Sequence, residues 1–281
     1  MVDLWSFGFV FVAGLLTALA TGVGAIPFFL VSDISDRWNV ALWGIASGIM
    51  VSASVFGLVF EALGAYVSVS ASGVSAAPIP RGVLALLAGG LLAGALLVYV
   101  AHDLIEAAEV DPKEYAEADF RKLVLILGVL TVHSFPEGVA VGVSFADLGI
   151  EGGTEVLGVA VPLLAIFMTV AISIHNVPEG IAISIPLRSM GVPNWKLVWW
   201  AVFSSLPQPV GAVLAFYFVR TAREFLPAGF GFAAGAMIYL VLTEFIPEAR
   251  ELGRGLPGGG KRELVGGLVA GGLAMLPLLF V

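Results

Sequence analysis

The chain alternates between long apolar runs and short clusters of charged or turn-forming residues. Runs of about twenty apolar residues are long enough for a helix to cross the hydrocarbon core of a bilayer. They predict eight spans, near residues 4–31, 39–64, 82–104, 121–146, 155–187, 195–219, 228–248 and 262–281. Strands are not expected, because the runs are continuous and rich in Leu, Ala and Gly instead of alternating. We therefore expect an all-α integral membrane protein with one polytopic domain over residues 1–281.

Composition supports this fold class. Hydrophobic residues make up 59% of the chain and charged residues only 12%, against about 25% charged residues in soluble domains. The absence of cysteine excludes disulfides and thiolate metal sites, so His, Asp, Glu, Asn and Gln are the available ligands. The net charge of -8 lies mostly in loops and gives no reason to expect a nucleic-acid partner.

The basic residues indicate an orientation. If the N-terminus lies outside, the loops on the inner side hold ten of the thirteen Lys and Arg residues. These are Arg37, Lys113, Arg121, Lys122, Arg188, Lys196, Arg250, Arg254, Lys261 and Arg262. Only Arg81, Arg220 and Arg223 then lie outside. Because Lys and Arg accumulate on the cytoplasmic side, both termini are expected outside, which requires an even number of spans.

Short segments recur with one constant separation along the chain, which we call the repeat offset. The first occurrences are Val23-Gly24-Ala25, Gly48, Met50 and Glu61-Ala62, and the second are Val210-Gly211-Ala212, Gly235, Met237 and Glu248-Ala249. The repeat offset relates the first expected span to the sixth and the second to the seventh, in opposite orientation. This pattern predicts an inverted repeat of spans 1–3 and 6–8 around spans 4 and 5, an arrangement typical of transporters. The alternative is chance, since Gly, Ala and Val are common in this chain.

The fourth and fifth expected spans carry nearly the same eight residues, 133–140 and 175–182. Each copy has a His and, four residues later, a Glu, which lie on one face of a helix. The four residues are His133, Glu137, His175 and Glu179. Between them Pro136 and Pro178 lack an N–H and so leave a carbonyl one turn earlier without its usual partner. The glycines that follow, Gly138 and Gly180, permit close approach of another helix.

Four ionisable groups near the bilayer centre require a physical reason. Each charged group there costs roughly 2.5 to 3.5 kcal/mol on insertion scales. Two neutral imidazoles and two carboxylates carry a charge of -2, which one dication neutralises. We therefore interpret the paired motifs as a metal site. The alternative is that Pro and Gly shape the helices while each His pairs with a Glu.

The two motifs, the run from Thr21 to Phe29 and the run from Ala234 to Ala249 resemble the ZIP (Zrt/Irt-like) family of divalent-metal transporters. The resemblance covers essentially the whole chain and is closest to the branch with His-x-x-Pro-Glu-Gly motifs in both central helices. It implies eight spans with both termini outside, in a multi-pass protein of the cell membrane. It also implies uptake of a divalent metal ion into the cytoplasm, typically zinc and sometimes iron, manganese, cobalt or cadmium, without a cofactor.

The resemblance also implies roles for particular residues. His133, Glu137, His175 and Glu179 match the central metal site of the family, and Asn176 matches a ligand of a second, adjacent site. At two other positions of that second site this chain has Ser134 and Gln208 instead of Asn and Glu. Since an amide is a weaker and uncharged ligand, we expect the second site to be weak or absent.

Three further residues match a cytoplasmic exit site of the family. His102 and Asp103 lie near the inner end of the third expected span, and Glu244 lies within the seventh. The alternative for His102 and Asp103 is that they are solvated groups at a helix end. Divalent ions and lipid are the expected partners, and the oligomeric state, a homodimer included, stays open.

Enzymatic alternatives are disfavoured by missing motifs. An intramembrane metallohydrolase predicts His-Glu-x-x-His, and a serine enzyme predicts Gly-x-Ser-x-Gly, and neither occurs in the chain. A di-metal redox protein usually has Glu-x-x-His pairs, whereas here His precedes Glu. We expect a transporter and no enzyme. The sequence leaves open whether a carrier or a channel-like pore moves the ion.

Overall fold

The structure, a computed structural model, describes residues 4–31, 34–70, 73–107, 134–150, 153–189 and 191–277. This part of the chain is mostly helical, and six of its helices are long and apolar enough to cross a membrane. They cover Leu4–Phe29, Asp36–Leu63, Arg81–Asp103, Leu163–Ile185, Asn194–Thr221 and Arg223–Gly255. Of the other two expected spans, residues 121–133 of the fourth lie outside the described residues. The eighth is represented by a helix that ends at Ala274.

The helices are α1 (Leu4–Val23), α2 (Asp36–Ser52), α3 (Phe60–Leu63), α4 (Arg81–Ala107), a helix over residues 134–144, α6 (Leu163–Ser189), α7 (Asn194–Ser204), α8 (Pro207–Thr221), α9 (Leu226–Leu240), α10 (Ile246–Leu252) and α11 (Lys261–Ala274). The short 3-10 segments are η1 (Ile26–Phe29), η4 (Arg223–Phe225), η6 (Gly253–Gly255) and η7 (Pro257–Gly260). Two π-helical segments, η2 (Ala53–Val59) and η5 (Val241–Phe245), continue α2 and α9. The strands are β1 (Val67–Ser70), β2 (Gly73–Ala76), β3 (Thr154–Val156) and β4 (Val159–Val161).

The two short antiparallel hairpins, β1–β2 and β3–β4, differ from the expectation of helices alone. The second hairpin occupies residues 154–161, where we expected the fifth span to begin at residue 155, and α6 starts only at Leu163. Its turn residues, Leu157 and Gly158, have φ of 50° and 78°. Positive φ at both turn positions is typical of a tight two-residue hairpin. Apolar Val residues here pair across a hairpin instead of continuing a helix.

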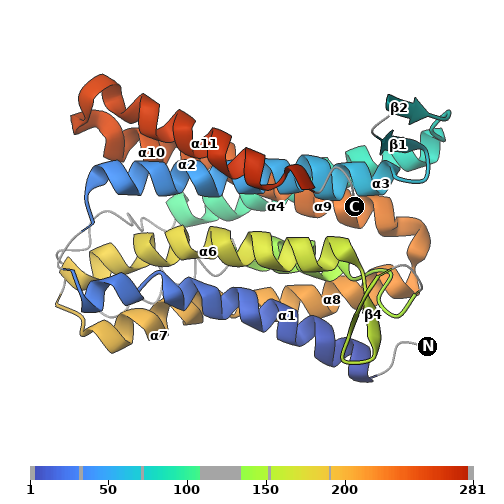
Figure 1. The fold of residues 1–281 in the computed structure, drawn as a ribbon, viewed down its shortest axis with the longest axis horizontal. Coiled ribbons are helices and arrows are strands. Elements are labelled where there is room, and N and C mark those ends of the chain that lie inside the picture. The colour runs from blue at the N-terminus through green and yellow to red at the C-terminus, as the bar shows by residue number, and fades with distance from the viewer. Residues whose placement is uncertain are drawn as a thin grey trace.

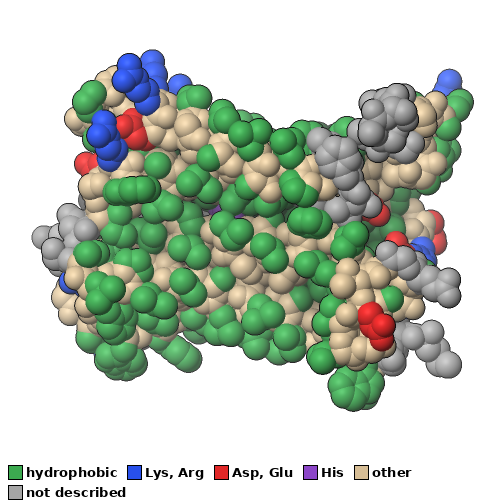
Figure 2. Space-filling view, in the orientation of Figure 1, with side chains coloured by type: hydrophobic (Ala, Val, Ile, Leu, Met, Phe, Trp, Pro, Cys, Tyr) green, Lys and Arg blue, Asp and Glu red, His purple; other side chains and the backbone are tan. Residues whose placement is uncertain are grey.

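The helices form two layers that run along the same direction (Figure 1). One layer contains α1, α6, α7 and α8, and the other contains α2, α4, α9, α10 and α11. The helix over residues 134–144 packs against α8 and so belongs to the first layer. Both chain termini lie at the same end of the layers (Figure 1). Figure 2 shows a face on which charged side chains gather at the two ends, with a broad apolar surface between them. This distribution is that of a protein whose middle lies in a bilayer.

Glycines set the close contacts of the first layer. Gly24 faces the carbonyl oxygen of Val177 so closely that a Cβ would overlap it. Gly211, which the repeat offset relates to Gly24, faces the carbonyl oxygen of Phe135 in the same manner. Hence α1 packs on α6 as α8 packs on the helix over residues 134–144. Small residues allow helix backbones to approach in this way in membranes.

The second layer has the same correspondence. On α2, Gly44 and Gly48 face carbonyl oxygens of α11. The repeat offset relates them to Gly231 and Gly235 on α9, which face carbonyl oxygens of α4. The π-helical segments η2 and η5 also fall at equivalent positions of the two halves. Glycines related by the repeat offset thus make similar close contacts in the two halves, although the carbonyl groups that they face are not themselves related by that offset.

Candidate metal centre

The middle of α6 supplies two ligand candidates to one point. His175 and Glu179 are one turn apart on α6, which remains helical through Pro178. From the facing helix over residues 134–144 comes Glu137. All three residues are buried, with exposed fractions of 0%, 6% and 1% for His175, Glu179 and Glu137. The four-residue spacing of His175 and Glu179 places both on the face of α6 that meets the helix carrying Glu137.

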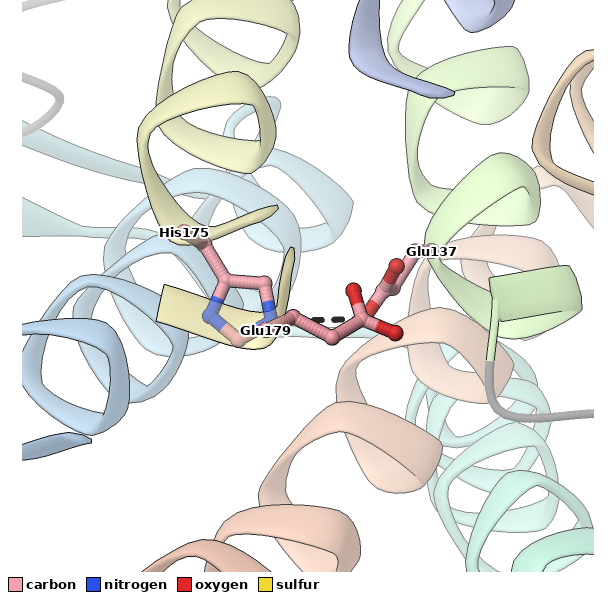
Figure 3. A group of neighbouring side chains, drawn as sticks. All are labelled: Glu137, His175 and Glu179. Atoms are coloured by element: carbon pink, nitrogen blue, oxygen red, sulfur yellow. Dashed lines mark ion pairs between the residues drawn. The ribbon is translucent and has the colours of Figure 1, made fainter. Parts of the chain in front are cut away.

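The three side chains converge. One nitrogen or oxygen ligand atom from each of Glu137, His175 and Glu179 lies within 4.8 Å of the others. The Nε2 atom of His175 is 3.4 Å from Oε1 of Glu137, an ion-pair distance without the geometry of a hydrogen bond. Figure 3 shows both carboxylates and the imidazole pointing toward a common position between the helices. A metal ion at this position would contact all three groups without any movement of the helices that carry them.

Several polar atoms at this point lack partners among the described residues. Both ring nitrogens of His175 and the Oε2 atom of Glu179 are buried there without a hydrogen bond. Buried polar atoms are normally paired, and a buried carboxylate is costly unless a cation or donors satisfy it. The arrangement of acceptors around a shared position therefore fits a cation better than it fits a purely structural cluster.

Two buried amide side chains form hydrogen bonds next to the cluster. The Nε2 atom of Gln208 donates a hydrogen bond to Oε2 of Glu137 at 2.6 Å. The Nδ2 atom of Asn176 donates to Oε1 of Gln208 at 3.0 Å and to the carbonyl oxygen of Thr17 at 2.7 Å. Asn176 and Gln208 are fully buried. In this structure the NH2 groups of both amides donate hydrogen bonds, whereas Oδ1 of Asn176 is buried without a hydrogen-bond partner among the described residues.

An aromatic wall that sequence reasoning missed closes one side of the cluster. The imidazole of His175 stacks on Phe245 of η5, and Phe245 contacts Trp43 of α2. Nothing in the motif spacing points to these rings, because they come from the other layer. A weak signal was available, since Phe245 directly follows Glu244, a charged residue in an apolar span.

The remaining predicted residues are only partly brought to the cluster. His133 lies outside the described residues. Ser134 is buried at the beginning of the helix that carries Glu137. His102 and Glu244 approach each other, with Nδ1 of His102 3.3 Å from Oε1 of Glu244, and form a half-buried pair outside the group of three ligand candidates. Asp103 is exposed next to His102 on α4.

The helices and the buried cluster define a class of protein: a helical membrane protein with a candidate cation site in its interior. Three groups of acceptor atoms with two carboxylates favour a divalent ion. Such an ion would be cargo or a resident ligand, and the geometry of the cluster is compatible with either.

Comparison with known proteins identifies the family. The family model described as "ZIP Zinc transporter" matches residues 101–256. The zinc transporter GufA of Myxococcus xanthus is 32% identical over 269 residues, which cover 95% of this chain and 96% of that protein. The zinc transporter ZupT of Corynebacterium aurimucosum is 30% identical and covers 90% of the chain and 91% of its own length. The chain belongs to the ZIP zinc transporter family.

A longer relative is also similar. A protein of Arabidopsis thaliana, whose name describes a zinc transporter, is 38% identical over 84% of this chain. The matched region covers only 33% of the length of the plant protein. Membership of a transporter family agrees with the expected resemblance and points away from an enzyme.

Proposed function

We propose that this protein takes up divalent metal ions, zinc foremost, across the cell membrane into the cytoplasm. The observation that carries the proposal is the buried group of Glu137, His175 and Glu179, whose ligand atoms face one position. His133 precedes Glu137 by one helical turn in the sequence and is the proposed fourth ligand. Two neutral imidazoles with two carboxylates match the charge of a dication and the geometry that zinc accepts. Iron(II), manganese, cobalt and cadmium are further candidate substrates for such ligands.

We propose eight spans in a single domain over residues 1–281, with an inverted repeat of spans 1–3 and 6–8. The equivalent glycine contacts in both layers, related by the repeat offset, support the repeat. Both termini are proposed to face outside. Seven of the ten basic residues that the structure describes support this orientation, because they belong to the start of α2, the end of α6, the start of α7 and the segment from α10 to α11, and Figure 1 places these parts at the end opposite the termini: Arg37, Arg188, Lys196, Arg250, Arg254, Lys261 and Arg262.

The packing changes the motion that sequence reasoning suggests. An inverted repeat around spans 4 and 5 would by itself suggest that the repeats move against those two spans. However, α1 and α8 contact those two spans through glycine-to-carbonyl packing too close for sliding. We therefore propose that the first layer, with the cluster, moves as a unit against the second layer. The boundary between the layers includes the contact of α2 with α6. Such alternating access would open the cluster first outward and then inward.

We propose that the ion passes the pair formed by Glu244 and His102 when it is released to the cytoplasm. Glu244 lies on η5, directly before the Phe245 ring that stacks on His175. Asp103 follows His102 at the end of α4, where it is exposed. A π-helical segment often occurs at a functional site because it widens the helix locally. The lipid bilayer and the transported ions are the proposed partners, and a homodimer remains the alternative to a monomer.

Uptake of radiolabelled zinc into proteoliposomes of checked protein orientation tests the function. We expect saturable uptake by the wild type and loss of uptake in the double variant His175→Ala, Glu179→Ala. The matched control is Glu155→Ala, which removes a carboxylate from the exposed strand β3, and it should transport normally. Equal uptake by the double variant and the wild type would refute the proposed path. A carrier saturates at a low turnover, whereas a channel-like pore does not.

A further inference from the structure

A cavity of about 440 Å³ lies between the two layers of helices. Its walls come from α4 and α9 of the second layer and from α8 and the helix over residues 134–144 of the first layer, with one residue from η4. The fifteen lining residues of the described chain are all Ala, Gly, Leu, Val or Phe, so no side chain there can form a hydrogen bond. None of the three ligand candidates is among them. The cavity is therefore a second feature of the interior, with a size typical of sites for small molecules.

One side of the cavity opens onto the apolar surface of the helices. Phe218 and Phe225 line this side, with exposed fractions of 51% and 42% and ring centroids 6.0 Å apart. Deeper in the wall, Val139 is only 7% exposed. A buried water needs about two to four polar partners, which these side chains do not supply. At the depth of the spanning helices the surrounding molecules are lipids, so a lipid chain is the apolar group that can reach this cavity.

The cavity extends over the depth of about one lipid leaflet. Along α4 its lining runs from Ala85 to Ala93, and α4 begins one helical turn earlier, at Arg81. The helix rises about 18 Å from Arg81 to Ala93, at about 1.5 Å per residue. One leaflet is about 15 Å deep, half of the hydrocarbon core. A lipid whose headgroup lies beside Arg81 can therefore place its chain along α4 as far as Ala93.

Arg81 is suited to bind the phosphate of such a lipid. It is one of three basic residues expected on this side of the membrane, and the other two, Arg220 and Arg223, are bound to residues 146–148. The side chain of Arg81 is exposed and has no hydrogen bond or ion pair with the described residues. It also begins a helix of 27 residues, and helix N-termini attract anions. Basic residues at a bilayer surface favour anionic headgroups in the same way.

We propose that this cavity binds one acyl chain of a membrane phospholipid, whose phosphate lies at Arg81. The inference goes beyond the proposed function, in which lipid is only the surrounding medium. Because the walls of the cavity belong to both layers, the bound chain contacts both of them. Movement of the first layer against the second requires that the chain leave or rearrange. The phospholipid therefore stabilises the arrangement of the layers described here.

Photolabelling from the lipid tests this site. The full-length protein is reconstituted in vesicles of phosphatidylcholine and phosphatidylglycerol with a trace of phosphatidylglycerol that carries a diazirine in its acyl chain. After illumination, labelled residues are located by peptide mass spectrometry. We expect label on Val139, which lipid on the outer surface of the helices cannot reach. Val265, 56% exposed on α11, reports that surface lipid. Label on Val265 without label on Val139 would overturn the inference, and this result needs no variant.

Filling the cavity should exclude the chain. Gly89 lines the cavity, and a Cβ there would meet nothing within 4 Å, so Gly89→Leu has room to extend into it. The matched control is Gly266→Leu on α11, where a Cβ also meets nothing within 4 Å but the cavity is not lined. We expect the label on Val139 to fall at least about tenfold in Gly89→Leu and to stay unchanged in Gly266→Leu. Equal label on Val139 in the two variants would overturn the inference.

The role of the phosphate has its own test. Loss of one basic residue at a bilayer surface corresponds to about a fivefold change in binding, so Arg81→Gln should lower the label on Val139 about fivefold. Arg262→Gln, an exposed residue at the start of α11, is the control and should have no effect. A diacylglycerol with the same diazirine chain has no phosphate and should label the wild type less than the phospholipid does.

Equal labelling by the two lipids, or an unchanged label in Arg81→Gln, would overturn the assignment of the site to a phospholipid. None of these results depends on zinc. Loss of the proposed zinc uptake would therefore refute the proposed function and leave the lipid site in place, whereas loss of the label on Val139 would do the reverse.

Discussion

The imidazole of His175 lies stacked on the ring of Phe245, with ring centroids 5.1 Å apart and planes inclined by 22°. His175 belongs to the first layer of helices, and Phe245 to the second. Phe245 is itself held by Trp43, at a centroid distance of 4.9 Å. A candidate ligand is thus oriented by a contact across the boundary at which we propose movement. Ion binding and the relative position of the layers are therefore physically linked through this stack.

Removing the ring at position 245 should weaken ion binding. Phe245→Leu keeps an apolar side chain but loses the flat surface on which His175 rests. Aromatic contacts are worth about 0.5 to 1.5 kcal/mol, so we expect zinc affinity to fall about two- to tenfold. Phe245→Tyr should retain most of the affinity. The matched control is Phe225→Leu, at a half-exposed ring in η4. Equal zinc affinities for Phe245→Leu and Phe225→Leu, measured by competition titration, would contradict a role for the stack.

Gly180 should not accept a side chain. Its backbone lies against the carbonyl oxygen of Thr21, and a Cβ there would overlap that atom. Forcing atoms into a packed interior typically costs about 1 to 3 kcal/mol, so Gly180→Ala should lower the thermal unfolding temperature and separate α1 from α6. The control is Gly89→Ala on α4, where a Cβ would meet nothing within 4 Å. Because Ala favours helices over Gly, this control should be neutral or stabilising. A Gly180→Ala variant as stable as Gly89→Ala would disprove the close contact.

Much of the candidate site could be predicted from local sequence. The four-residue spacing of His175 and Glu179 places them on one face of a helix whatever surrounds that helix. Gly138 and Gly180 indicated close helix approach, and both are in such contacts. The six described apolar helices agree with the membrane protein expected from composition. These features depend on residues within one or two helical turns.

What could not be predicted depends on contacts between distant segments. The stacking of Phe245 on His175 requires the register of two helices in different layers, which no local pattern contains. Whether Gln208 would be a weak metal ligand or a hydrogen-bond donor to Glu137 is likewise decided by Asn176, which orients its amide. The β3–β4 hairpin was missed because its Val residues are as apolar as the helix that follows.

The pair formed by Glu244 and His102 should affect the rate of transport more than binding. These residues form a half-buried pair outside the group of three ligand candidates. If they lie on the release path, Glu244→Gln should lower the maximal rate of zinc uptake several-fold and reduce zinc binding at the central cluster much less. Glu155→Gln, an exposed carboxylate on β3, is the control and should change neither quantity. The measurements are initial uptake rates in proteoliposomes and equilibrium binding. A loss of binding in Glu244→Gln that matches its loss of rate would place Glu244 in the binding site instead.

Labelling of single cysteines should reveal the orientation in the membrane. The chain has no cysteine, so each introduced thiol is the only one present. Glu155 is exposed on the β3–β4 hairpin, and Arg254 is exposed on η6 between α10 and α11. The hairpin lies at the end of the layers where both termini lie, whereas the turn between α10 and α11 lies at the opposite end (Figure 1). These two positions therefore report on the two sides of the membrane.

A membrane-impermeant maleimide, applied to intact cells, should label Glu155→Cys and leave Arg254→Cys unmodified. After permeabilisation both variants should react to the same extent, which confirms that both thiols are accessible. This result is expected because the basic residues near Arg254 favour the cytoplasmic side. Labelling of Arg254→Cys but not of Glu155→Cys in intact cells would place both termini inside. The side of the protein that we assign to the outside would then face the cytoplasm. This result would refute the proposed direction of transport, which is uptake.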